Sequence, residues 1–190
     1  MFCNYQLLGG FHISDLLLSS TDRAHLVRLV GSRVRQLVWD INAIYFVGDN
    51  GVLNVTADIR TPPSPTPHVF DEAACLTVGT ETQARRFRDE GEYGYVYRVV
   101  ATDVLVERVE IVRTGIVMPG EEVWALTAPA PPDSIVTPCD CGILITTPFG
   151  VLPAVQTENV YGFMNWVELR LYERAEVALV LGEHYEIITL

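Results

Sequence analysis

The sequence predicts an α+β domain made of mostly antiparallel β-sheets with short flanking helices. Residues 21–40 repeat apolar side chains at helical spacing, and residues 94–113 alternate apolar and polar side chains like a half-buried strand. Between them, GDNG at 48–51 separates two β-rich runs and is typical of a hairpin turn. With 190 residues, 49% of them hydrophobic and 19% charged, the chain is expected to form one compact unit around a single core.

The N-terminal part predicts one helix and a hairpin. The helix covers 21–40, with Thr21 or Asp22 as N-cap. Strands at 41–48 and 51–57 follow it on either side of the turn. The apolar face expected for the helix consists of Leu26, Leu29, Val30, Val34, Leu37 and Val38.

The remaining elements follow from turn and alternation signals. The stretch TPPSPTP lacks backbone donors at its prolines and is expected to be an exposed loop. The strand at 94–113 is expected to turn near Thr102 and Asp103. The other predicted elements are a buried strand at 73–78, a short helix from Thr80 to Gly91, strands at 121–128 and 142–147, a proline-set turn at 129–136, and a helix at 165–179.

The charge balance excludes some partners. The net charge of -11 repels nucleic-acid phosphates and anionic lipid surfaces, so neither is expected as a partner. Arg85, Arg86 and Arg88 stand among acidic residues and are typical of the solvated face of a helix. No stretch reaches the 18 or so apolar residues of a membrane span. The first 20 residues lack a basic start, so the protein is intracellular or a targeting segment was removed before residue 1.

All 13 basic residues are arginine, and the chain contains no lysine. A genome rich in arginine codons would produce this usage. Selection against ubiquitination would produce it too, because arginine keeps the positive charge without the amine that accepts ubiquitin. Such selection is expected in proteins that reach a host cytosol through the quality-control export route. Both causes remain open.

The four cysteines, Cys3, Cys75, Cys139 and Cys141, allow two disulfides or a reduced set. Cys139 and Cys141 stand too close for an easy mutual bridge and lack the further ligands of a zinc site, so no metal is expected. The usual motifs of dinucleotide, phosphate-loop, zinc-protease and serine-hydrolase sites are absent as well.

The order of elements between residues 54 and 136 resembles the pertussis- and cholera-type ADP-ribosylating toxins. The stretches that carry the resemblance are CLTVGTETQARRFRDEGEYGYVYRVVATD at 75–103 and EEVWALTAPAPPDSIV at 121–136. In that family they correspond to a Ser-Thr-Ser strand followed by a helix and a further strand, and to a strand that carries a catalytic glutamate. The resemblance implies an ADP-ribosyltransferase-like domain at 51–190, preceded at 1–50 by a helical extension with a hairpin strand.

The resemblance also implies chemistry. ADP-ribose transfer from NAD passes through an oxocarbenium-like ribose, which a carboxylate stabilises, while an arginine grips the pyrophosphate. Glu122 matches the catalytic glutamate, with Glu121 as the alternative. Asp58, Arg60 and Thr77 match cofactor-binding positions, so NAD would be the substrate and no metal is needed. The family's first arginine falls at Thr56, however, and its two serines fall at Leu76 and Val78.

Three functions are therefore compatible with the sequence. The first is a divergent mono-ADP-ribosyltransferase toxin or effector that is secreted or delivered into a host cell, where it modifies a host protein, with a possible delivery subunit. The second is a catalytically inactive binding module with the same fold. The third is an unrelated α+β interaction domain, which would be cytoplasmic.

Overall fold

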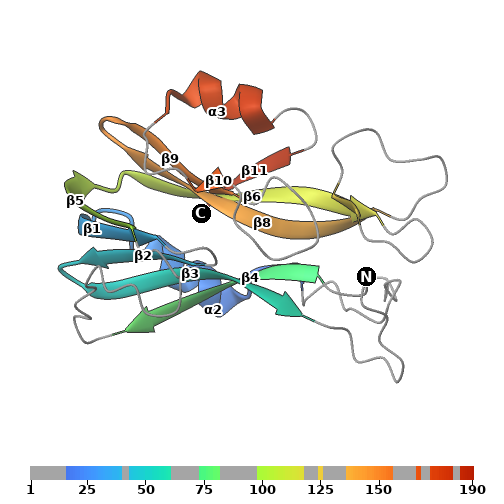
Figure 1. The fold of residues 1–190 in the computed structure, drawn as a ribbon, viewed down its shortest axis with the longest axis horizontal. Helices are drawn as coiled ribbons and strands as arrows, with labels where there is room; N and C mark the ends of the chain where they lie inside the picture. The colour runs from blue at the N-terminus through green and yellow to red at the C-terminus, as the bar shows by residue number, and fades with distance from the viewer. Residues whose placement is uncertain are drawn as a thin grey trace.

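The computed structural model describes residues 16–39, 43–60, 73–81, 98–117, 124–125, 136–155, 166–167, 172–181 and 185–190. Two antiparallel β-sheets lie face to face, with one helix on the outer face of one sheet and a second at the side (Figure 1). The predicted mostly antiparallel sheets with short flanking helices are confirmed.

The first sheet has five strands in the order β4-β3-β2-β1-β5. The hairpin predicted around GDNG joins β2 to β3, and Gly48 pairs with Gly51 across the turn. The predicted buried strand at 73–78 is part of β4, which pairs antiparallel with β3. The bounds are β1 (Arg33–Trp39), β2 (Ala43–Gly48), β3 (Gly51–Arg60), β4 (Ala73–Glu81) and β5 (Arg98–Leu105).

The second sheet has six strands. Five follow the order β10-β9-β8-β6-β11, and β7 pairs with β6 beside them. The predicted strands at 142–147 and 121–128 correspond to β8 and, over two residues, to β7. The bounds are β6 (Arg108–Val117), β7 (Trp124–Ala125), β8 (Val136–Thr147), β9 (Gly150–Val155), β10 (Trp166–Val167) and β11 (Tyr185–Thr189).

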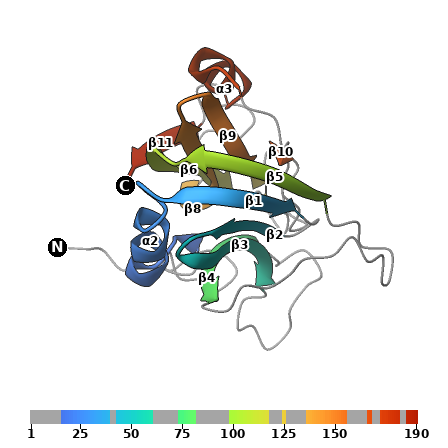
Figure 2. The same cartoon turned by 90° about the vertical axis from the view of Figure 1, so that its left-hand side faces the viewer.

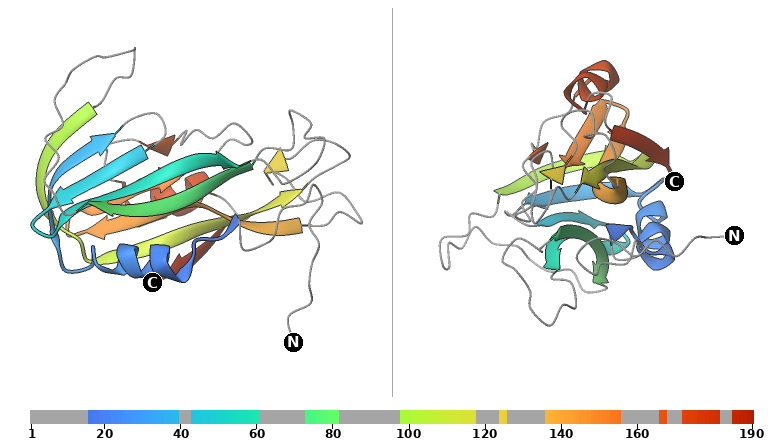
Figure 3. Two further views of the ribbon diagram at one scale, coloured as in Figure 1. Left: turned by 90° about the horizontal axis from the view of Figure 1, so that it is seen from below. Right: turned by 90° about the vertical axis from the view of Figure 1, so that its right-hand side faces the viewer.

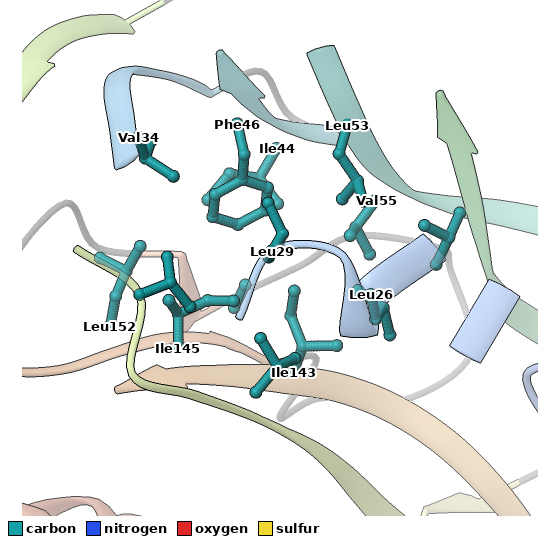
Figure 4. Packing of buried hydrophobic residues seen from close by; sticks show 14 of the residues in the cluster. Leu26, Leu29, Val34, Ile44, Phe46, Leu53, Val55, Ile143, Ile145 and Leu152 are labelled. Carbon is teal, nitrogen blue, oxygen red and sulfur yellow. The ribbon is translucent and has the colours of Figure 1, made fainter. Parts of the chain in front are cut away.

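The main core lies between the sheets. Figure 4 shows Phe46 and Val55 of the five-stranded sheet facing Ile143 and Ile145 of the six-stranded sheet. All four are almost completely buried. Side chains alternate across a strand, so the residues between them face outward.

The six-stranded sheet is also covered on its outer face. Helix α3 (Arg174–Leu181) lies over that face (Figure 2), and Val177 and Leu181 pack there with Leu144 and Val155. This explains why β8 reads as the continuous apolar run GILITT rather than as an alternation.

Helix α2 (Ser20–Val27) lies at the side of the sandwich (Figure 3). Ser19 is its N-cap and forms a capping box with Asp22. The predicted helix at 21–40 was wrong in its second half, because the chain turns at Gly31, where φ is +78°, and continues as β1. Leu37 and Val38 are neighbours in β1, and both are buried. Two adjacent buried residues fit the apolar face of a helix, which is why this strand resembled a helix in the sequence.

Three further boundaries differ from the prediction. The turn expected near Thr102 and Asp103 is a bulge within β5, with Asp103 at φ 134°, and the chain leaves the sheet after Leu105. The helix expected from Thr80 is wrong at its start, since β4 continues to Glu81; residues 82–97 lie outside the described residues. The helix expected at 165–179 begins only at Arg174, after β10.

Some predictions fall on residues that the structure does not describe, namely the proline loop at 61–67 and the turn at 129–135. Strands β1, β9 and β11 were not predicted. Neither α2 nor α3 has the length or the apolar character needed to span a lipid bilayer.

Candidate functional site

A strip of small polar residues lies on the outer face of β3 and β4. Leu53 and Val55 face the core, so Asn54 and Thr56 face outward. Thr56 pairs with Thr77 across the strands, and Asn54 pairs with Gly79. The Asn54 Nδ2 donates a hydrogen bond to Thr56 Oγ1 at 3.3 Å. We call Asn54, Thr56, Thr77 and Gly79 the β3–β4 strip.

The predicted cofactor-binding residues belong to this pair of strands. Thr77 is half-buried and stands opposite Thr56. Asp58 pairs with Cys75, and Arg60 pairs with Ala73. The period of two places positions 56, 58 and 60 on one face of β3. The structure therefore brings the three predicted cofactor positions onto neighbouring strands.

The positions of the family's two serines lie on the opposite face. Leu76 and Val78 are 5% and 7% exposed and belong to the core between the sheets. Apolar residues fit there because both side chains are buried in the main core rather than on the strip. Of the three positions that match Ser-Thr-Ser, only Thr77 offers a hydroxyl.

The predicted catalytic residues, Glu121 and Glu122, lie outside the described residues. Strand β7, which begins two residues after Glu122, belongs to the six-stranded sheet, whereas β4 belongs to the five-stranded sheet. Strand β7 and the strand that carries Thr77 thus belong to different sheets.

A buried carboxylate that the sequence analysis missed lies on β8. The Asp140 side chain is fully buried and accepts hydrogen bonds from Arg113 Nε at 2.7 Å and from the Leu18 backbone N–H at 2.9 Å. The Arg23 Nη2 lies 3.4 Å from Asp140 Oδ2, the oxygen that also accepts from the Leu18 N–H. These contacts fasten the segment before α2 to the six-stranded sheet. The available signal was an acidic residue in the middle of an otherwise buried strand.

A second buried carboxylate, Glu110 on β6, holds α3. Both terminal nitrogens of Arg174 bind the two oxygens of Glu110, one of them (Nη2) at 2.8 Å. The Arg108 Nε lies 3.5 Å from Glu110 Oε2. The fork of an arginine suits this two-point contact, which a lysine amine cannot reproduce.

Helix α2 also binds the edge of the five-stranded sheet. The Val78 backbone N–H donates to Asp22 Oδ1 at 2.9 Å, and His25 Nδ1 lies 3.4 Å from the Val78 carbonyl oxygen. Burial would raise the pKa of Asp22, but hydrogen bonds from the Ser19 hydroxyl and from the Val78 and Ser19 N–H groups outweigh it and hold the pKa below its ordinary value.

The two cysteines on β8, Cys139 and Cys141, are both buried, and Cys141 forms no disulfide. Burial, with a smaller contribution from Asp140, raises the pKa of Cys141 to about 12. This thiol therefore stays protonated at neutral pH and is a poor nucleophile or metal ligand. Within the described ranges, no three His, Cys, Asp or Glu side chains form a group that could hold a metal ion.

Comparisons with known proteins found no relative of the chain. No protein-family model, no curated protein and no solved structure matches the chain.

Proposed function

We propose that the chain is an effector-type binding module that holds NAD on the outer face of β3 and β4 without cleaving it. The observation that supports this function is the register, which pairs Thr56 with Thr77 and sets positions 58 and 60 on the same face. Arg60 would contact the pyrophosphate in place of the arginine that the family pattern puts at position 56. Thr77 would contact a ribose hydroxyl.

Binding without chemistry is favoured by what surrounds Thr77. The family braces its glutamate and the nicotinamide ribose with two serines, and here those positions are the core residues Leu76 and Val78. Thr56 is short, uncharged and already hydrogen-bonded to Asn54. A site with these substitutions keeps contacts to the ground state but lacks the two hydroxyls that would hold the glutamate in place for the transition state. The absence of lysine fits an effector that avoids ubiquitination in a host cytosol.

An active mono-ADP-ribosyltransferase is the second candidate. It is favoured by the same register, since Asp58, Arg60 and Thr77 all match the family at positions that the sheet brings together. In that case Glu122, or Glu121 one residue earlier, would stabilise the oxocarbenium-like ribose, and a host protein would receive the ADP-ribose.

Two measurements on the same preparations separate these functions. NAD binding is measured by titration calorimetry, and nicotinamide release is measured by chromatography. The variants are Arg60→Gln, Glu122→Gln and the double variant Glu121→Gln/Glu122→Gln. Arg35→Gln serves as the control, because Arg35 is an exposed arginine of β1 whose loss changes the net charge equally.

The binding module predicts that NAD binds to the wild type and to Arg35→Gln, that Arg60→Gln weakens binding about tenfold, and that nicotinamide is never released. Release that Glu122→Gln or the double variant abolishes would replace this conclusion with the transferase. Failure of the wild type to bind NAD would overturn both candidates.

A further inference from the structure

A hollow of about 100 Å³ lies at the end of the sandwich where α2 meets the β2–β3 hairpin. Its apolar wall is built from Leu29, Phe46, Val52 and Leu53, all of them buried. Figure 4 shows Leu29 and Phe46 converging from the two sides of this end of the core. A space of this kind is smaller than the ~150 Å³ apolar cavity that holds benzene, so it suits a branched group of four or five carbons.

Glycines at the hairpin help to form the space. Gly48 and Gly51 both line the hollow and contribute only backbone to its wall. A Cβ at Gly48 would lie 2.4 Å from the Arg33 carbonyl oxygen, so a larger residue is excluded there by the close approach of β1.

One of the residues that line the hollow, Arg28, is positively charged. Arg28 is exposed and follows α2 as its C-cap. The other arginines whose side chains the structure describes all bind carboxylates: Arg23 and Arg113 bind Asp140, Arg108 and Arg174 bind Glu110, Arg33 binds Asp103, and Arg35 binds Asp49. Arg28 has no such partner among the described residues. A cation at a helix C-terminus is favourable in itself, but that interaction leaves its N–H donors open to solvent.

We infer that this hollow is a binding site for a small branched-chain carboxylic acid. The apolar wall would take the branched hydrocarbon, and the Arg28 guanidinium would take the carboxylate. Ser32, Asn50 and Thr80 add polar residues to the lining. The site lies at the β2–β3 turn, so it is separate from Arg60 at the other end of β3 and does not depend on NAD binding.

The probe is isovalerate, with isovaleramide as the uncharged ligand of the same shape. Binding is followed by methyl NMR shifts of Leu29, Val52 and Leu53. The variants are Arg28→Gln, which removes the charge, and Thr80→Phe, which fills the mouth of the hollow. Arg35→Gln again serves as the control, since Arg35 does not line the hollow.

We expect isovalerate to bind with a Kd of roughly 1 mM and the amide to bind about tenfold more weakly. Arg28→Gln should lower the affinity for isovalerate about tenfold and leave the amide unchanged, while Arg35→Gln should behave as wild type. Thr80→Phe should block both ligands. Equal affinity for acid and amide, equal effects of Arg28→Gln and Arg35→Gln, shifts centred elsewhere, or no saturable shift would each overturn the inference.

Discussion

The two sheets use their outer faces differently. The outer face of the six-stranded sheet is packed under α3, and two carboxylates of this sheet, Asp140 and Glu110, are buried and held by arginines. The outer face of the five-stranded sheet carries the small, polar β3–β4 strip. The six-stranded sheet thus anchors both helices, and the five-stranded sheet presents the residues proposed to bind a ligand. Substitutions in the six-stranded sheet should affect stability, and substitutions in the β3–β4 strip should affect binding.

The largest effect is expected at Asp140. Asp140→Ala leaves Arg113 and Arg23 without their shared carboxylate and leaves the Leu18 N–H without an acceptor. Removing one partner of a buried ion pair costs about 3–5 kcal/mol of unfolding free energy, measured by urea denaturation. Arg35→Ala, which breaks the exposed pair with Asp49, should cost far less, because solvent screens such a pair. Similar losses in the two variants would contradict an anchoring role for Asp140.

Two glycines give a matched pair, one on each sheet. A Cβ at Gly142 on β8 would meet backbone atoms of β9, with Val155 Cα at 2.6 Å and Ala154 O at 2.7 Å. Gly142→Ala should therefore cost about 1–3 kcal/mol. For a Cβ at Gly79 on β4, the three nearest atoms all belong to the Asn54 side chain, with Oδ1 at 2.4 Å, and that amide can rotate away.

Gly79→Ala should for that reason cost less than Gly142→Ala in thermal unfolding at equal protein concentration. The same variant should weaken NAD binding, since it displaces a residue of the β3–β4 strip. A Gly79→Ala protein as unstable as Gly142→Ala would remove the contrast between the sheets.

The ion pair between Arg174 of α3 and Glu110 of β6 tests whether arginine is needed at position 174. Arg174→Lys keeps the charge but loses the two-point contact with Glu110, so it should cost roughly 1–2 kcal/mol and speed hydrogen exchange in α3. At the exposed position 35, Arg35→Lys should leave stability almost unchanged.

The Arg35→Lys variant also addresses the missing lysines. The exposed pair of Arg35 and Asp49 does not require a guanidinium, so folding does not explain arginine there. With its single lysine, this variant should be ubiquitinated in a cell extract that leaves the wild type without lysine conjugates. Absence of ubiquitin on Lys at position 35 of the variant would favour codon usage as the cause.

The smallest effect is expected at Asp22 and depends on pH. The folded-state pKa of Asp22 is lowered, so its contribution to stability is present above the ordinary value of 3.8 and is lost as pH falls through the folded pKa. The stability difference between wild type and Asp22→Ala should thus shrink on acidification from pH 7. A difference that stays constant down to strongly acidic pH would contradict this assignment.

Local signals predicted part of the fold well. The turn glycines of the hairpin, the buried run at 73–78 and the strand at 142–147 all carry information within a few residues. The strand β1 was mistaken for helix because Leu37 and Val38 are adjacent and both buried, and the pairing of this segment with β2 and β5 is not visible in its own sequence. Tertiary context decided the structure there.

The candidate site was less predictable than the fold. The pairing of Thr77 with Thr56 depends on the register of β3 against β4, and no short turn signal between these strands fixes that register in the sequence. The buried roles of Asp140 and Glu110 depend on arginines far away in the sequence, at positions 23, 113 and 174. Sequence spacing could therefore suggest residues for chemistry, but not which carboxylates serve the fold.

The contact between α2 and Val78 has a further consequence for behaviour in concentrated solution. Strand β4 is the last strand of its sheet, and the side chains of Asp22 and His25 occupy the outward N–H and carbonyl of Val78. An open strand of this kind is where another molecule could add to the sheet and begin a fibril. Helix α2 thus hinders the addition of another strand at Val78. Loss of α2 is expected to cause aggregation before it weakens ligand binding.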